Sequence, residues 1–127
     1  MIDKITIGIV EIKGKILLVK RATKEGNLEW VFPGGKIEEN ESEEESVERE
    51  IYEETNIRCK ATKKLGQRTH PDTGKIISYW ICDYLSGDEA IKNPKEIKKI
   101  KWLIPNEIFK IIKTNIYRPL IEYLKKL

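Results

Sequence analysis

Cysteine and histidine are scarce in this chain of 127 residues, which contains two Cys and one His. Cys59 and Cys82 are far apart in the sequence and form no C-x-x-C motif, so the cysteine pattern indicates no disulfide framework. Two cysteines without such a framework are typical of a protein from a reducing compartment. We therefore expect a cytoplasmic protein.

Long hydrophobic runs are also missing. The longest apolar stretches, such as residues 16–19, are far shorter than the roughly 20 residues that cross a bilayer. The N-terminal segment lacks the basic and apolar regions of a signal peptide, so we expect no membrane partner. The length suits one domain over residues 1–127, which can bury roughly two thirds of the surface that the unfolded chain exposes and needs no metal or disulfide to fold.

The charge that is present is distributed unevenly. The formal net charge is +3, but ten of the 21 acidic residues lie between positions 38 and 54, and the rest of the chain has 23 basic and 11 acidic residues. A basic body attracts polyanions, whereas dense carboxylates repel them unless a divalent cation intervenes. The pattern favours a phosphate ligand bridged by a metal ion, although a solvated acidic helix face would give the same composition.

The order of predicted elements indicates an α/β fold. Segments rich in Ile and Val alternate with turn signals, and Ser42 with Glu45 forms a capping box that should start a helix. Asn56 suits the left-handed conformation that ends a helix. The predicted strands are 4–12, 15–22, 58–65, 75–85 and 97–103, the predicted helices are 43–55, 107–113 and 117–127, and residues 30–35 are predicted as a loop. This order predicts an α/β/α sandwich with a mixed β-sheet between helices.

Three carboxylates on the helix at 43–55 should repel one another. Glu50, Glu53 and Glu54 are related by i,i+3 and i,i+4 and therefore share one strip of surface. They also lie toward the C-terminal end of the helix, where the macrodipole favours cations. A divalent metal would compensate this charge, and oxygen ligands without nearby His or Cys select Mg²⁺, or Mn²⁺ as an alternative, over Zn²⁺.

A longer pattern surrounds this helix. Its specified positions are Gly35, Glu41, Arg49, Glu50, Ile51, Glu53, Glu54, Asn56 and Ile57. Their spacing resembles the Nudix box, G-x5-E-x7-R-E-U-x-E-E-x-G-U with U bulky and aliphatic, and the one departure is Asn56 in place of the second glycine. Residues 30–34 also resemble the segment that directly precedes the box in MutT-like members. The resemblance implies the Nudix α/β/α sandwich and a MutT-like Nudix hydrolase.

The resemblance also implies a ligand set for the metal. Glu50, Glu53 and Glu54 would bind the ion, with the Gly35 carbonyl as a further ligand. Glu96 resembles an additional acid that MutT-like enzymes bring to the metal from a distant loop, although an ordinary exposed acid explains it equally well.

Catalytic and substrate-binding roles follow from the same resemblance. Arg49 would orient a carboxylate of its own helix, and either Glu53 or Glu50 would be the general base. Arg21 is positioned to reach a substrate phosphate, although a solvated charge at a strand end is the simpler interpretation. Asn115 resembles the place from which MutT-like enzymes read a guanine edge.

A few further residues have a structural and a functional interpretation. His70 lies in a predicted turn, which favours a surface residue over a ligand or base. Trp30, Phe32, Tyr79 and Trp80 could stack on a nucleobase, but aromatic residues in strands more often belong to the core.

The function implied by the resemblance is Mg²⁺-dependent hydrolysis of a nucleoside triphosphate, or an oxidised analogue, to a monophosphate and pyrophosphate by attack of water at phosphorus. Dinucleoside polyphosphates and nucleotide sugars are alternative substrates, and a non-catalytic nucleotide-binding module is an alternative function. Nucleic-acid binding through the Lys-rich C-terminal half is a further hypothesis, but no recognised motif supports it. We expect a monomer or a homodimer that binds a small nucleotide.

Overall fold

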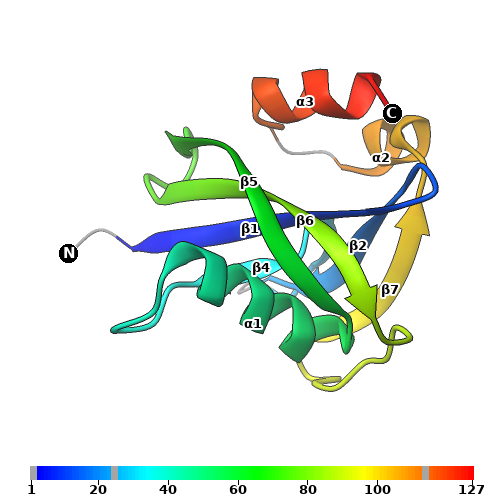
Figure 1. The fold of residues 1–127 in the computed structure, drawn as a ribbon, viewed down its shortest axis with the longest axis horizontal. Helices are drawn as coiled ribbons and strands as arrows, with labels where there is room; N and C mark the ends of the chain where they lie inside the picture. Colours follow the sequence, from blue (N-terminus) through cyan, green and yellow to red (C-terminus); the bar gives the residue numbers. More distant parts are fainter. Residues whose placement is uncertain (1–2, 24–25, 113–114) are drawn as a thin grey trace.

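A mixed β-sheet lies between helices in the computed structural model, which describes residues 3–23, 26–112 and 115–127. Helix α1 (Glu43–Thr55) covers one face, and α2 (Pro105–Ile111) and α3 (Arg118–Lys125) cover the other (Figure 1). The strands are β1 (Lys4–Ile12), β2 (Lys15–Ala22), β3 (Leu28–Val31), β4 (Gly34–Lys36), β5 (Arg58–Thr69), β6 (Ile76–Ser86) and β7 (Ile97–Leu103). The predicted α/β/α sandwich is confirmed.

The sheet combines hairpin pairings with one parallel pairing. Its order is β3-β2-β1-β6-β5, with β4 also paired to β1 and β7 to β2. Strand β1 runs parallel to β6 and antiparallel to β2. The predicted β1–β2 hairpin turns at Lys13 and Gly14, whose φ angles of 50° and 80° are the left-handed values that a tight two-residue turn requires.

Two separate hydrophobic cores hold the layers together. On the α1 face, the fully buried side chains of Val47 and Ile51 pack against Val10 and Leu17. The close approach of α1 depends on Gly8, where a Cβ atom would lie 2.3 Å from Ile51 Cδ1. The second core lies beneath α2 and α3 and contains residues such as Leu18, Ile108 and Leu124.

Helix α1 forms where the sequence predicts it. The Ser42 hydroxyl accepts a hydrogen bond from the Glu45 amide at 3.0 Å, and the Glu45 carboxylate accepts one from the Ser42 amide at 2.9 Å, so the capping box is complete. Asn56 ends the helix with φ 68°. The Asn at this position therefore preserves the helix stop that glycine would provide.

Several other boundaries differ from the prediction. Residues 30–35, predicted as a loop, contribute to β3 and β4, because β3 pairs with β2 and β4 pairs with β1. Strand β5 continues past the predicted end at residue 65 to Thr69, and residues 66–69 pair with β6. Helix α2 starts two residues earlier than predicted, with Pro105 in its first turn, and α3 spans 118–125 rather than 117–127.

No helix in the described ranges has both the length and the apolar character needed to cross a bilayer.

Candidate active site

The three carboxylates of the predicted metal strip lie at the C-terminal end of α1, beside β4. Gly35 approaches Glu50 so closely that a Cβ atom on the glycine would lie 2.5 Å from the Glu50 carboxylate. Strand β4 packs on α1 through this contact and through Gly34. The last turn of α1 contains no basic residue. The C-terminal end of α1 is therefore acidic, as the sequence indicates, and it packs against the two glycines of β4.

Glu54 is the most buried of these acids, with 4% of its surface exposed. Its Oε1 atom accepts a hydrogen bond from the Gly34 amide at 3.1 Å, but Oε2 is buried without a hydrogen-bond partner in the described structure. Burial raises the pKa of this carboxyl to about 8, although Arg21 and the Gly34 amide act in the opposite direction. A buried carboxylate oxygen without a donor is unfavourable unless something binds it.

Arg49 gathers the other acids of the motif around one guanidinium group. Its Nε and Nη2 atoms donate to the two carboxylate oxygens of Glu41 at 2.6 and 2.9 Å. Its Nη1 atom donates to Glu50 at 2.9 Å and to Glu53 at 3.1 Å. Nη2 also reaches the Lys36 carbonyl at 3.2 Å, so the helix is tied to the end of β4.

These contacts change the ionisation of the neighbouring groups. The hydrogen bond from Arg49 lowers the pKa of Glu41 to about 2 against the opposing effect of burial. Burial raises the pKa of Glu50, and the nearby charges of Glu53 and Glu96 add to this effect, while Arg49 opposes it. The pair Glu41–Arg49 is therefore firmly ionised and holds the orientation of the guanidinium.

Arg21 and Glu96 approach the same region from β2 and from the loop before β7. The Arg21 guanidinium forms an ion pair with Glu96 and lies 3.8 Å from Glu54 Oε2. Within the described residues, no three His, Cys, Asp or Glu side chains converge as a complete set of metal ligands. The carboxylates are instead paired with the two arginines: Arg49 contacts Glu50 and Glu53, and Arg21 contacts Glu54 and Glu96.

The donor set nevertheless fits a hard divalent cation. The available ligands are carboxylate oxygens and the Gly35 carbonyl, which are the atoms that Mg²⁺ and Mn²⁺ prefer. Glu54 Oε2 accepts no hydrogen bond within the described residues, and the three atoms nearest to a Cβ built on Gly35 all belong to the Glu50 carboxylate. A cation at this place would satisfy the unpartnered oxygen.

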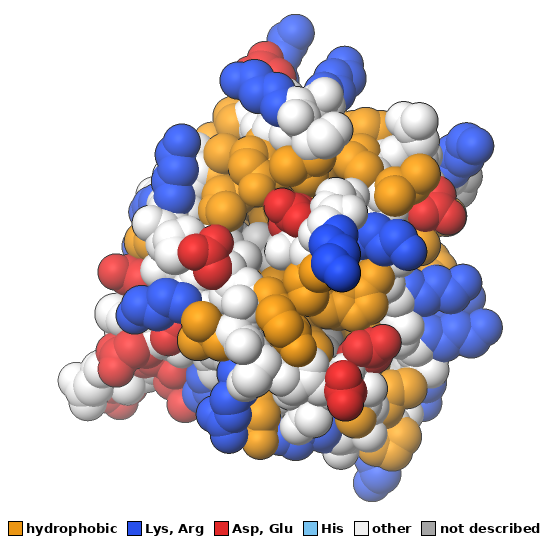
Figure 2. Space-filling model, turned by 45° about the vertical axis from the view of Figure 1, so that its right-hand side comes forward, with side chains coloured by type: hydrophobic (Ala, Val, Ile, Leu, Met, Phe, Trp, Pro, Cys, Tyr) orange, Lys and Arg blue, Asp and Glu red, His pale blue; other side chains and the backbone are white. Residues whose placement is uncertain are grey.

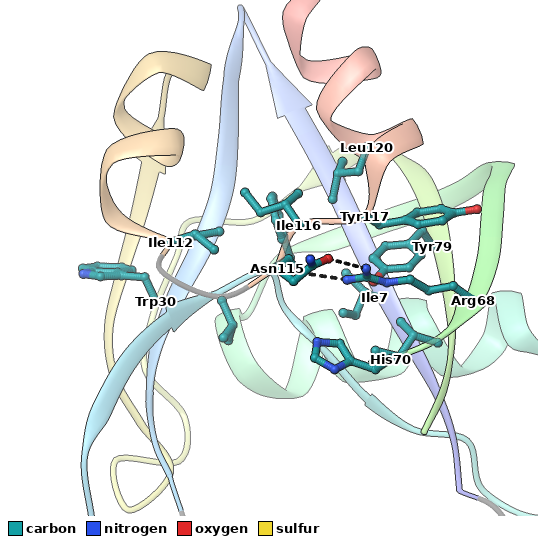
Figure 3. Close-up of a pocket in the computed structure, with 13 residues that line it drawn as sticks. Ile7, Trp30, Arg68, His70, Tyr79, Ile112, Asn115, Ile116, Tyr117 and Leu120 are labelled. Atoms are coloured by element: carbon teal, nitrogen blue, oxygen red, sulfur yellow. Dashed lines mark hydrogen bonds between the residues drawn. The ribbon is translucent and has the colours of Figure 1, made fainter. Parts of the chain in front are cut away.

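A pocket of about 150 Å³ opens on the face of the sheet that carries α2 and α3. Its apolar walls come from β1, the end of β3, β6 and the segment around α3, and they include Ile7, Trp30, Phe32, Ile77, Tyr79 and Leu120. Figure 3 shows Arg68, His70 and Asn115 grouped within this pocket, with Trp30 on the opposite side. The pocket is thus mainly apolar, with a few polar groups, as is common for small-molecule sites.

The aromatic residues considered in the sequence divide between the two faces. Trp30, Phe32 and Tyr79 line the pocket. Trp80 instead packs on the α1 side, where its indole N–H donates to Glu43 at 2.9 Å. His70 is partly buried and lines the pocket.

Arg68 is a site residue that sequence reasoning missed. It donates to Asn115 Oδ1 at 2.6 Å and to the Asn115 carbonyl at 2.9 Å, across 47 positions of the chain. The strand was predicted to end at residue 65, which left Arg68 outside any element. Pairing with β6 extends β5 to Thr69 and brings Arg68 to the pocket. Its position depends on this non-local pairing, which no local pattern signals.

Comparison with known proteins identifies relatives of the whole fold. The profile described as the NUDIX domain matches residues 4–124. An ADP-ribose pyrophosphatase of Methanocaldococcus jannaschii is 35% identical over 108 residues, which cover 82% of this chain and 63% of that protein. A MutT-like protein of Streptomyces ambofaciens is 31% identical over 100 residues, which cover 79% of this chain and 62% of that protein. The chain thus spans less than two thirds of the length of these relatives.

A solved structure shares the architecture. The crystal structure of a NUDIX hydrolase from Nitrosomonas europaea superimposes with a TM-score of 0.84 at 25% sequence identity, covering 98% of this chain and 70% of that one.

Proposed function

The chain belongs to the NUDIX domain family, and from this premise we propose that it is a Mg²⁺-dependent hydrolase of a nucleoside triphosphate, or an oxidised analogue, that releases a monophosphate and pyrophosphate. The observation that carries this proposal is the Oε2 atom of Glu54, which is buried and accepts no hydrogen bond within the described residues, close to the Glu50 carboxylate that lies over Gly35. Members of the family generally use a divalent metal. The arrangement supports a cation site at the end of α1.

Residues on three elements would hold the ion. Glu50, Glu53 and Glu54 come from α1, the Gly35 carbonyl comes from β4, and Glu96 comes from the loop before β7. A bound Mg²⁺ would lower the pKa of a water molecule and neutralise charge on the phosphate oxygens. Mn²⁺, which prefers similar ligands, is an alternative ion.

Two side chains of α1 would have different roles in the hydrolysis. Water attacks phosphorus, its proton passes to a carboxylate, and the bridging P–O bond breaks to release pyrophosphate. Glu53 is suited to accept the proton because its side chain is 56% exposed, more than the 17% of Glu50. Arg49 holds both carboxylates in place.

Substrate binding would use groups near both parts of the site. The Arg21 guanidinium lies beside Glu54 and Glu96, and its positive charge would bind a substrate phosphate there. The pocket lined by Trp30, Phe32 and Tyr79 offers flat apolar surfaces for a base, and Asn115 contributes an amide at its polar side.

A panel of nucleotides tests the proposal. Wild-type protein with Mg²⁺ should release pyrophosphate from at least one nucleoside triphosphate, and Glu53→Gln should lower kcat by about 100-fold or more, because a general base contributes roughly 10²–10⁴-fold. Glu44→Gln is the matched control, since Glu44 is an exposed acid on the same helix. Abundant turnover by the Glu53 variant would remove this residue from its proposed role.

Metal binding can be tested separately from turnover. Glu54→Gln keeps the size of the side chain but removes the carboxylate, so Mn²⁺ titration followed by electron paramagnetic resonance should show affinity weakened by about tenfold or more. Unchanged Mn²⁺ affinity would exclude Glu54 from the ligand set. Glu44→Gln again serves as the control.

Nucleotide sugars are the second candidate class of substrate. The observation that favours them is the 35% identity to the ADP-ribose pyrophosphatase of Methanocaldococcus jannaschii. Including ADP-ribose, other nucleotide sugars and dinucleoside polyphosphates in the same panel separates the classes by kcat/KM. A nucleotide-binding module without catalysis would bind members of the panel and hydrolyse none.

The surface gives less support to nucleic-acid binding. On the face in view, Figure 2 shows Lys and Arg side chains along the edge and also near the middle, interspersed with acidic and apolar groups rather than joined in one stripe. A small nucleotide is therefore the proposed partner. The buried, unpaired Cys59 and Cys82 agree with the cytoplasmic location that we propose.

A further inference from the structure

Arg68 is held at the pocket by several partners at once. Its Nε atom donates to the Tyr79 hydroxyl at 3.1 Å, while Nη1 and Nη2 donate to Asn115. Its guanidinium carbon also lies 5.4 Å from the centre of the Tyr117 ring, which stacks on Tyr79 with centroids 4.6 Å apart. Figure 3 shows these side chains together. Contacts to three residues leave the guanidinium little freedom to turn.

This contact fixes the orientation of the Asn115 amide. A guanidinium group has only donors, so the amide atom that contacts Arg68 must be the carbonyl oxygen Oδ1. The bond at 2.6 Å therefore turns Oδ1 toward Arg68, uses one of its two lone pairs, and leaves the NH₂ group on the other side of the amide for a ligand. Within the described part of the chain, Nδ2 of Asn115 has no hydrogen-bond partner.

The polar side of the pocket consequently offers donors. The Asn115 NH₂ and the Arg68 guanidinium both donate hydrogen bonds. His70, the third polar side chain there, accepts from the Asp72 amide at Nδ1, so its ring hydrogen is on Nε2 and it is a further donor. A base edge with a carbonyl oxygen can accept from them. An exocyclic amino group at the same position would place donor against donor and would leave buried polar groups unpaired, which weakens binding.

We propose that Arg68 is a positioning residue that orients the Asn115 amide and thereby selects nucleobases with a carbonyl oxygen over those with an amino group at the edge facing Asn115. This inference rests on the proposed function, because it takes the pocket as the base site. It goes beyond that proposal by assigning the source of base selection to a residue outside the metal motif.

Matched pairs of nucleotides test the selection. Inosine and adenosine triphosphates differ at position 6 of the purine, and uridine and cytidine triphosphates differ at position 4 of the pyrimidine, in each case as carbonyl against amino group. The wild-type protein should favour the carbonyl member of at least one pair by about tenfold or more in kcat/KM, the ratio expected when one buried polar group loses its partner. Ratios near one in both pairs would overturn the proposal.

Arg68→Met should bring that ratio close to one, because the Asn115 amide is then free to present either its oxygen or its NH₂ group. The matched control is Arg58→Met, which makes the same change on the same strand but outside the pocket, where Arg58 stacks on Tyr52. The control should retain the wild-type ratio. A merely structural role for Arg68 would lower all rates together and leave the ratio unchanged, and that result would contradict the proposal.

Asn115→Asp provides a second variant with an opposite expectation. An aspartate has only acceptors, so the preference should disappear or turn toward the amino member of the pair. Retention of the wild-type carbonyl preference by this variant would show that Asn115 does not read the base.

A binding measurement separates this inference from the proposed reaction. Inosine and adenosine monophosphates can be titrated into the full chain while the Asn115 side-chain NH₂ resonances are followed by NMR. Selective, tighter binding of inosine monophosphate with a shift of those resonances would support the inference even if no triphosphate were hydrolysed. Turnover of triphosphates without base preference would overturn the inference and leave the proposed hydrolysis intact.

Discussion

Glycines at single positions decide how closely the backbone approaches the acidic helix. Gly35 lies against the Glu50 carboxylate, whereas Gly34 lies against backbone, since a Cβ atom there would be 2.0 Å from the Thr6 carbonyl oxygen. The carboxylate end of a glutamate can move, but a paired strand cannot. The two neighbouring glycines are therefore expected to tolerate substitution differently.

Gly35→Ala should weaken metal binding with little loss of stability. The new methyl group would displace the Glu50 carboxylate, so we expect Mn²⁺ affinity to fall by about tenfold or more, as when the support of a ligand is lost. Thermal melting should change by only a few degrees. Gly34→Ala, by contrast, should destabilise the fold by about 1–3 kcal/mol or more, because the strand pairing must shift. Wild-type Mn²⁺ affinity in Gly35→Ala would contradict this assignment.

Glu43 is the residue that ties the start of α1 to the sheet. Its carboxylate contacts Lys4 Nζ of β1 at 2.7 Å, Lys64 Nζ of β5 at 3.0 Å and the Trp80 indole of β6 at 2.9 Å. Burial alone would raise the pKa of this carboxyl, but the hydrogen bonds from Lys4, Trp80 and Lys64 lower it to about 2. One side chain thus links a helix to three strands.

At the scale of the element, this link predicts a stability that depends on pH. The folded pKa of about 2 lies below the ordinary value of 4.5, so the stabilisation is present above pH 4.5 and is lost as the pH falls toward 2. Glu43→Gln should therefore lower the free energy of unfolding by about 1 kcal/mol at pH 7, allowing for solvent screening.

Urea denaturation at pH 7 and at pH 3 measures this difference. The gap between wild type and Glu43→Gln should narrow at the lower pH, while Glu44→Gln should resemble wild type at both. A gap that stays constant between the two pH values would show that the Glu43 charge does not contribute in this way.

The elements that could be predicted from the sequence are those with local signals. Helix α1 carries its capping box and its terminal Asn56 within the sequence, and both ends agree with the structure. Strand β4 contains only Gly34, Gly35 and Lys36, and it exists because β1 is available to pair with it. Three residues with two glycines carry no periodicity, so a loop was the reasonable prediction.

The candidate site likewise contains one part that the local sequence predicts and another that depends on the fold. The acidic strip was predictable because its spacing lies within one helix. The Arg68–Asn115 contact joins residues 47 positions apart and depends on the extension of β5 and on the chain that follows α2. The ion pairs of Arg21 with Glu54 and Glu96 also required the fold, because β2, α1 and the loop before β7 meet only in three dimensions.

On the scale of the whole molecule, binding of metal and nucleotide should stabilise the fold. A ligand at 100 times its Kd contributes about 2.7 kcal/mol, which for a chain of this size corresponds to a rise in Tm of about 8 °C. We expect this rise with Mg²⁺ and a triphosphate whose α–β bridge is a methylene group. In EDTA the rise should be much smaller. Equal shifts in Mg²⁺ and in EDTA would argue against a metal that the nucleotide shares.

The two cores lie on opposite faces of the sheet, with the acidic helix packed on one and the pocket opening on the other. Substitutions at Asn115, Ile116 or Tyr117 alter the walls of the pocket without touching the packing of α1. If the pocket binds the base, as we propose, descendants of such a protein can exchange one preferred base for another by accumulating changes near α3, while the proposed metal site on α1 is inherited intact.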